Sequence, residues 1–310
     1  MISELFTLTV LVGIAHSGIR LATPYLFAAL GETFAQRSGV LNLGVDGIML
    51  MGAFSAFYVV YATGNLWLGV LAAIVVGGVM GLLMAVVSVT MQAEQGISGI
   101  GLSLFGLGLS SLLLKALVGS PISIDGFPVL EIPLLKDIPV IGPIFFDHDI
   151  LVYIAYLLVP VSLYLLYRTT FGLKIRAVGQ NPEAADSLGV RVNAVRYGTV
   201  IFGSALAGLA GASLSIGLLN IFQENMTNGI GYIAVALVYF GGWRPIGVLI
   251  GALLFSTVNA FQLWMQVLGV GIPSDLAVML PYILTIIALA LGVKQVRQPA
   301  ALTKPYERGE

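Results

Sequence analysis

Cysteine is absent from this chain of 310 residues, and only two histidines are present. Without thiols the protein has no disulfide, no iron–sulfur cluster and no cysteine nucleophile. His16 and His148 lie far apart in the sequence and lack the spacing of a zinc-binding HExxH motif. No glycine is followed directly by lysine, so the GxxxxGK[ST] loop that holds ATP is missing, and so is a GxSxG nucleophile motif. We therefore expect no enzymatic activity, no catalytic or metal-ligating residues and no cofactor in this chain.

Charged residues are scarce as well. They make up 9% of the chain, against about a quarter of a typical soluble domain. Hydrophobic residues make up 58%, and the mean hydropathy is +1.00. This composition predicts an all-α, polytopic transmembrane helical bundle, with residues 1–310 forming a single domain. The first residues lack a basic region ahead of their apolar stretch, which favours a retained first helix over a cleaved signal peptide.

Helical spans are expected where about 20 consecutive residues are predominantly apolar. By this measure the helices cover residues 5–30, 40–61, 66–91, 96–118, 150–167, 197–220, 229–242, 245–268 and 275–293. The seventh is short and is expected to be broken or re-entrant, which gives about 8 to 10 spans in all. Small residues recur every four positions, which predicts close helix packing inside the bundle or, alternatively, a subunit interface. They are Gly77 with Gly81, Gly203 with Ala207, Gly211 and Ser215, and Gly247 with Gly251.

The few charges are unevenly distributed along the chain. Basic residues concentrate in two segments, and the positive-inside rule places both in the cytoplasm; they are Arg168, Lys174, Arg176, Arg191 and Arg196, and Lys294, Arg297, Lys304 and Arg308. Residues 119–149 carry five acidic residues and one lysine, with several prolines, and are expected to form a structured, non-helical extracytoplasmic loop. The predicted protein is a multi-pass protein of the inner or plasma membrane with a cytoplasmic C-terminus and an outer N-terminus.

The cytoplasmic loop, residues 168–196, contains the sequence NPEAADSLG. Asn181 is suited to cap a helix, Pro182 to occupy its first position and Glu183 to lie near the positive end of its dipole. Gly189 is suited to end it in a left-handed conformation. The sequence therefore predicts a short capped helix, which is either a plain connector or a rigid lever for a cytoplasmic motor.

Two segments carry a resemblance to a known family. The loop resembles the EAA-type coupling helix of ABC importer permeases, and GETFAQRSGVLNLGVDGIMLMGAFSAF, residues 31–57, resembles the signature of the simple-sugar, nucleoside and branched-chain amino acid branch. The segments RAVGQNPEAADSLGVRV and YFGGWRPIGVLIGALLF fit the same branch, so that the similarity covers most of residues 20–295. The sequence around Ser38 is most similar to that of nucleoside-type permeases. It has Asp46 where those permeases commonly have glutamate, and Gln36 where they often have glutamate.

This resemblance implies a permease subunit of an ATP-driven importer that forms the translocation path for a nucleoside-like solute by alternating access. It implies separate ATPase subunits that hold ATP and Mg, an extracytoplasmic solute-binding protein and a second permease, unlike or identical. The ATPase-coupling residues would be Asn181, Pro182, Glu183, Ala184, Ala185, Asp186 and Gly189. A simple-sugar or branched-chain amino acid permease, and an ATPase-independent secondary transporter, are the alternative interpretations.

An aspartate inside the apolar stretch LNLGVDGIMLMGAF needs a partner, because a carboxylate in lipid costs about 2.5–3.5 kcal/mol. We consider three roles for Asp46: a structural pair with Arg37, satisfaction of backbone groups freed near Gly44 and Gly47, or contact with the solute. The pair with Arg37 is the prediction that we adopt.

Neutral polar residues in apolar surroundings are candidates for the translocation path, because a hydroxylated solute needs hydrogen-bonding groups without a tight grip. They are Asn42, Asn220, Gln223, Asn228, Tyr232, Asn259 and Gln262. Each could instead serve helix packing or an interhelical hydrogen bond.

Overall fold

The computed structural model describes residues 7–131, 133, 135–136, 138–269, 279, 283, 286–287 and 298–307. Its long helices are α1 (Leu8–Arg37), α2 (Val45–Thr63), α3 (Leu66–Ala85), α4 (Gln95–Leu117), α6 (Ile150–Arg168), α9 (Val192–Ala212) and α11 (Pro245–Val267). Shorter helices are α5 (Ile141–Phe145), α7 (Thr170–Gln180), α8 (Pro182–Ser187) and α10 (Ile230–Phe240). Two π-helical segments, η2 (Val86–Thr90) and η3 (Ser213–Leu218), continue α3 and α9.

Seven of the described helices are long and apolar enough to cross a membrane, so the predicted all-α polytopic fold is confirmed. α10 is apolar but has only 11 residues, as expected for the short seventh helix. The first eight predicted helices overlap α1, α2, α3 with η2, α4, α6, α9 with η3, α10 and α11. The ninth, residues 275–293, lies outside the described residues apart from a few isolated positions.

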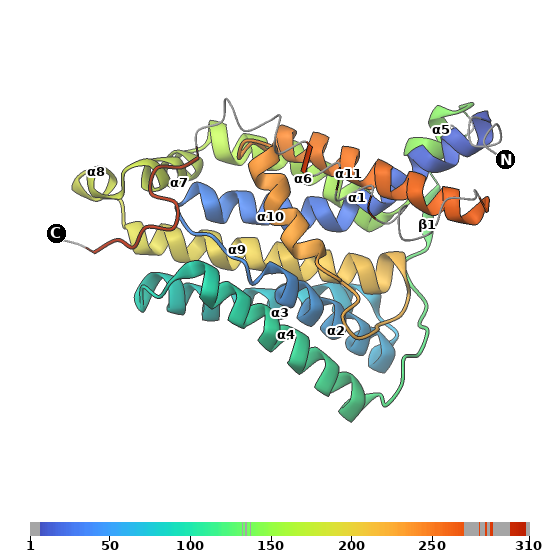
Figure 1. Ribbon diagram of the computed structural model, residues 1–310, viewed down its shortest axis with the longest axis horizontal. Helices are drawn as coiled ribbons and strands as arrows, with labels where there is room; N and C mark the ends of the chain where they lie inside the picture. Colours follow the sequence, from blue (N-terminus) through green and yellow to red (C-terminus); the bar gives the residue numbers. More distant parts are fainter. Residues whose placement is uncertain are drawn as a thin grey trace.

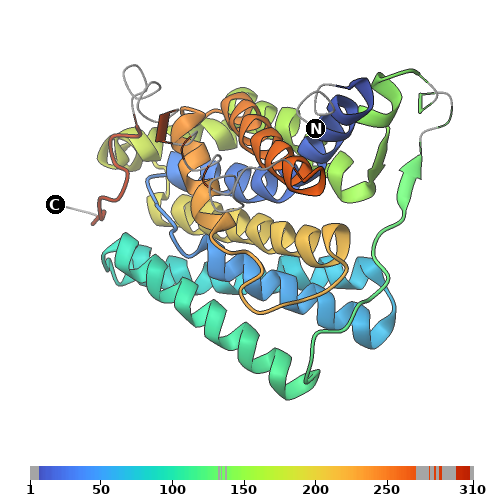
Figure 2. The same cartoon turned by 45° about the vertical axis from the view of Figure 1, so that its right-hand side comes forward.

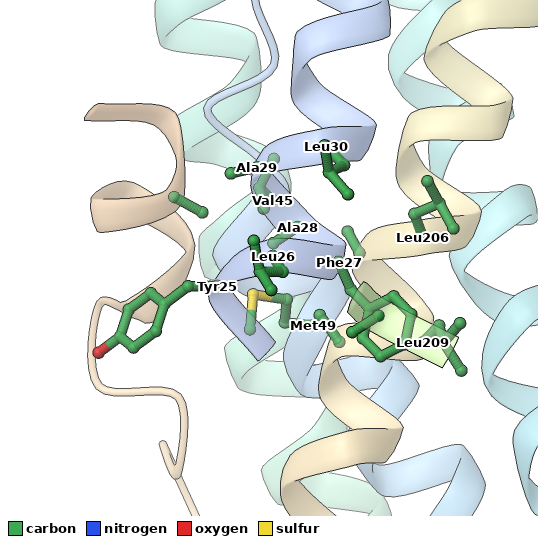
Figure 3. Packing of buried hydrophobic residues seen from close by; sticks show 14 of the residues in the cluster. Tyr25, Leu26, Phe27, Ala28, Ala29, Leu30, Val45, Met49, Leu206 and Leu209 are labelled. Carbon is green, nitrogen blue, oxygen red and sulfur yellow. The ribbon is translucent and has the colours of Figure 1, made fainter. Parts of the chain in front are cut away.

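The centre of the bundle is formed by α1, α2 and α9 (Figure 1). Leu26, Phe27 and Leu30 of α1 are fully buried there, next to Met49 of α2 and Leu209 of α9 (Figure 3). Burial all round is expected for a span that contacts other helices and not lipid. α4 runs along the outside of the bundle and contacts mainly α2 (Figure 2).

The four-residue repeats of small residues lie where helices cross closely. A Cβ atom on Gly77 of α3 would come within 2.5 Å of the Ser204 carbonyl oxygen of α9, and one on Gly211 within 1.9 Å of the Met49 carbonyl oxygen of α2. Only glycine permits these approaches. The prediction of packing within the bundle is confirmed at these positions.

The loop at residues 119–149 contains regular structure. The short strands β1 (Val129–Glu131) and β2 (Asp147–Asp149) pair antiparallel, with Leu130 opposite His148. The expectation of a wholly non-helical loop is wrong at α5, because Pro143 lies in its first turn, where a missing N–H costs little. Figure 1 shows β1 and α5 at one end of the bundle, next to the start of α1, and α7, α8 and the C-terminal segment at the other.

Candidate coupling helix and translocation residues

The candidate coupling helix α8 has the ends that its sequence predicts. The Oδ1 atom of Asn181 accepts a hydrogen bond from the Ala184 amide at 2.9 Å, and Pro182 stands at the first helical position. After the helix, Gly189 has a φ of +82° and its amide donates to the Asp186 carbonyl oxygen at 2.8 Å. Both ends are thus closed locally, and α8 is a rigid two-turn unit.

The seat of α8 is a small apolar cluster to which the C-terminal segment contributes. Ala185 of α8 packs with Val178 of α7, Val192 of α9 and Tyr306, and all four are buried. These contacts join α8 to α9, the central helix of the bundle.

The C-terminal segment, residues 298–307, is hydrogen-bonded along its length. The Ala301 amide donates to the Gly179 carbonyl oxygen at 3.0 Å, and the Thr303 amide donates to the Gly39 carbonyl oxygen at 3.1 Å. A guanidinium N–H of buried Arg196 donates to the Lys304 carbonyl oxygen at 3.0 Å. The segment therefore ties the loop after α1, the end of α7 and the start of α9 together behind α8.

The outward face of α8 is open. Glu183, Ala184 and Ser187 are exposed, and the Leu188 side chain is 85% exposed at the end of the helix. The exposed leucine and the fixed ends of α8 make this turn a candidate contact surface for a partner protein. Sequence reasoning missed Leu188 because its exposure depends on how α8 is seated.

A second polar unit lies buried between α1, α9 and the turn before α11. Glu32 accepts hydrogen bonds from the Gln36 side chain and from the Asn42 amide, each at 2.9 Å. Asn42 donates to the Ser204 hydroxyl at 3.2 Å, and Gln36 accepts a hydrogen bond from the Trp243 indole at 2.7 Å. Asn42 is 2% exposed, and both its backbone amide and its side chain are hydrogen-bonded in this network.

The predicted pair of Arg37 and Asp46 is not formed. Asp46 accepts hydrogen bonds from the Thr227 hydroxyl at 3.1 Å and from the Gly231 amide at 2.9 Å. Gly231 is in the first turn of α10, whose free N–H groups attract a carboxylate, and these groups satisfy Asp46 without a cation. Asp46 therefore fastens α10 to α2.

Arg37 is engaged on the other side of α1. Its Nε atom donates to the Trp243 carbonyl oxygen, and its Nη2 atom donates to the Tyr167 hydroxyl, both at 2.8 Å. Because Arg37 ends α1 while Asp46 starts α2 after an intervening loop, the two side chains point to different neighbours. Arg37 joins α1 to α6 and to the turn between α10 and α11.

Four of the path candidates lie in the loop between η3 and α10 and in the first turn of α10. Asn220 and Asn228 have left-handed backbone conformations, with φ of +56° and +41°, and Gln223, Asn228 and Tyr232 are exposed. The buried Oδ1 atom of Asn220 has no hydrogen-bond partner in the described part of the chain. This region is the polar surface that the structure assembles from the predicted set.

Asn259 and Gln262 belong to a different face. They lie on α11, which packs against α1, α6 and α10, and Gln262 is buried. The structure therefore does not bring these two residues together with Gln223 and Asn228.

Comparison with known proteins agrees with this architecture. The family described as the permease component of branched-chain amino acid transport systems matches residues 14–289. TsgC13 of Haloferax volcanii, whose name assigns it provisionally to a glucose ABC transporter as a permease, is 39% identical over 96% of this chain and 98% of its own length. The guanosine ABC transporter permease NupQ of Bacillus subtilis is 35% identical, over 93% of this chain and 94% of its own.

A third relative, the nucleoside ABC transporter permease NupC of Lactococcus lactis, is also 35% identical, over 90% of this chain and 92% of its own. No solved structure matches the chain. A bundle of membrane-spanning helices, a capped EAA-type helix at one end and these matches along nearly the whole length lead to one assignment: the chain belongs to the family of permease components of branched-chain amino acid transport systems, and it is a permease subunit of an ABC importer.

Proposed function

We propose that this permease carries a nucleoside-like solute into the cell in a complex with ATPase subunits, a second permease and an extracytoplasmic solute-binding protein. The observation that supports this most directly is α8: it is capped at both ends, seated against α9, and presents Leu188 outward. A rigid helix of this kind can transmit the movement of a partner, whereas a flexible loop would absorb it.

The ends of the bundle support a cytoplasmic location for α8 and the C-terminal segment. The basic segment 168–196 and residues 298–307 lie at one end, and the acidic loop 119–149 lies at the other (Figure 1). The positive-inside rule makes the first end cytoplasmic. The hairpin of β1 and β2 would then face the binding protein, and α8 would face the ATPases.

The mechanism that we propose is alternating access. ATP, bound with Mg in the partner ATPases, drives their closure and displaces α8. The displacement passes through Ala185 and Val192 to α9, which also contacts α1, α2 and α3. A shift of α9 against these helices would open the path toward one side of the membrane or the other.

The solute would pass along the surface formed by the loop before α10 and by α10 itself. Tyr232 and Tyr239 are exposed and lie two turns apart on the same side of α10, and Gln223 and Asn228 are exposed in the loop before it. Aromatic faces and neutral amides suit a base or sugar ring with hydroxyl groups. The second permease, which we propose to be an unlike chain, would close the path from the opposite side.

The names of the relatives support a nucleoside cargo, with a sugar as the alternative. Two of them are guanosine and nucleoside permeases and one is assigned to glucose, whereas the family description names branched-chain amino acids. Uptake of labelled guanosine, competed with excess glucose or leucine in cells that depend on this permease, separates the three. Competition by glucose or leucine alone would assign the cargo to that class.

A pull-down of the tagged chain from its native membrane tests the complex. We expect mass spectrometry to identify a P-loop ATPase, a second permease and a solute-binding protein. If the chain is recovered alone after mild crosslinking, α8 is a connector and an ATPase-independent transporter replaces the proposal.

A further inference from the structure

Three membrane spans each have an arginine at the end that lies on the same side of the bundle. Arg37 is the last residue of α1, Arg168 is the last residue of α6, and Arg244 directly precedes α11. All three ends lie at the end of the bundle that carries α7 and α8 (Figure 1). The level at which several apolar spans end together corresponds to the boundary between the hydrocarbon core of the bilayer and its headgroups.

Two of these arginines, Arg37 and Arg244, form a cluster with Arg176 of α7, which we call the arginine cluster. Arg37 and Arg176 lie over the ring of Tyr167, with guanidinium carbons 5.9 and 5.1 Å from its centroid. Arg176 and Arg244 both lie close enough to Arg37 to repel its charge. Cation–π contact with one tyrosine relieves only part of this repulsion.

The cluster has no acidic counterpart. Within the part of the chain that the structure describes, no carboxylate forms an ion pair with Arg37, Arg176 or Arg244, and the buried Nε atom of Arg176 has no hydrogen-bond partner. Like charges gathered without a counterion disfavour the fold unless an anion joins them. The charge and the free donors therefore point to an anionic ligand.

The neighbouring helix α7 indicates where that ligand comes from. α7 begins directly after α6 and buries Ile175 and Val178, yet Phe171 and Leu173 are 45% and 58% exposed beside exposed Lys174. A short helix that directly follows a membrane span and exposes large apolar side chains as well as a lysine is typical of a helix that lies at the membrane surface. The arginine cluster thus lies at the depth of lipid headgroups, next to apolar side chains that suit acyl chains.

We propose that the arginine cluster binds the phosphate of an anionic phospholipid headgroup. The phosphate oxygens accept hydrogen bonds from the terminal guanidinium nitrogens of half-buried Arg176 and exposed Arg244, while Arg37 keeps its hydrogen bonds to Trp243 and Tyr167. The acyl chains of the lipid lie against α6 and the exposed apolar residues of α7. The site is separate from α8 and adjoins the path surface at Trp243, whose ring packs on Tyr239. Lipid binding there does not depend on the identity of the cargo.

Native mass spectrometry of the full chain in detergent, titrated with phosphatidylglycerol or phosphatidylcholine, tests this site. We expect phosphatidylglycerol to bind more tightly, and the variant Arg176→Gln/Arg244→Gln to lose about tenfold or more of that affinity.

The matched control is Arg191→Gln/Lys304→Gln, which removes two exposed basic residues at the same end and should keep the affinity. Neither Arg176 nor Arg244 donates a side-chain hydrogen bond among the described residues, so the thermal midpoint should hold. If the double variant does not fold, Arg244→Gln alone should weaken binding about threefold.

Four results would overturn the proposal. Equal affinity for phosphatidylglycerol and phosphatidylcholine would show that binding does not require an anionic headgroup. An equal loss of affinity in the control variant would assign the effect to the general surface charge. Displacement of phosphatidylglycerol by millimolar inorganic phosphate assigns the site to a free anion. Loss of the co-purifying ATPase, with lipid binding retained, assigns the surface to a protein partner.

Discussion

At the scale of single residues, Asp46 and Arg37 each bind neutral groups and do not bind each other. Asp46→Asn removes the charge and one of the two oxygens that accept from the Gly231 amide and the Thr227 hydroxyl, and we expect a loss of about 1–3 kcal/mol in the free energy of unfolding. Arg37→Gln acts elsewhere, so the two losses should add to within about 0.5 kcal/mol.

Thermal or denaturant unfolding of the two single variants and the double variant, in one detergent, measures this coupling. An interaction free energy above about 1 kcal/mol would show that the charges act on each other and would restore the pair that the sequence predicts.

Leu188 is the residue on which we expect the proposed docking of α8 to an ATPase to depend most. Burial of one leucine side chain contributes about 1.5–3 kcal/mol, so Leu188→Ala should reduce the ATPase retained on the purified complex about tenfold. Leu219→Ala, at a leucine that is 51% exposed near the start of the path loop, is the control and should retain it. Equal retention in both variants would place the tip of α8 outside the interface.

The two outcomes at this scale show what a sequence can reveal about a residue. The cap at Asn181 was predictable because its partner, Ala184, is three residues away and the geometry is local. The partners of Asp46 are Thr227 and Gly231, more than 180 residues away, and no spacing rule reaches that far. Arg37 was the charge nearest in sequence, and proximity in sequence proved a poor guide.

At the scale of elements, the hairpin of β1 and β2 contacts α1 through two stacked histidines, His148 of β2 and His16 of α1. The rings of His16 and His148 lie 4.5 Å apart, and each ring bonds a backbone carbonyl oxygen, that of Asp147 for His16 and that of Ile144 for His148. Burial, and the nearby charge of His16, lower the pKa of His148 below its ordinary value.

This lowered pKa predicts a pH dependence. The unfolded chain binds a proton on His148 more tightly than the folded chain, so stability is lost as the pH falls through about 6.5, the ordinary value for histidine. The thermal midpoint should therefore fall between pH 7.5 and 5.5. His148→Gln should flatten this slope, and an unchanged slope in the variant would exclude His148 as its source.

The spans were predictable because a run of about 20 apolar residues has no other stable location than a bilayer. α1 extends to Arg37, beyond its predicted end, because its polar residues Glu32 and Gln36 are satisfied by Asn42 and Trp243 from other elements. α7 was not predicted: it has 11 residues, and its apolar side is completed only by packing on its neighbours.

At the scale of the whole molecule, the absence of cysteine makes the orientation testable in the protein as it stands. Leu188→Cys and Ser120→Cys each introduce a single thiol at an exposed position, one at each end of the bundle. A membrane-impermeant maleimide should label Ser120→Cys in intact cells and Leu188→Cys only in inverted vesicles. The reverse pattern would invert the proposed topology.

The C-terminal segment has a consequence for how the protein is made. Residues 301–306 come after every described span in the chain, yet they complete the seat of α8. All of these helices must therefore be synthesised before the residues that hold α8 in place are made. A chain that terminates before Ala301 would lack these contacts to α8, and the proposed docking site for an ATPase would not be held rigidly. The order of synthesis would thus keep unfinished chains out of working transporters.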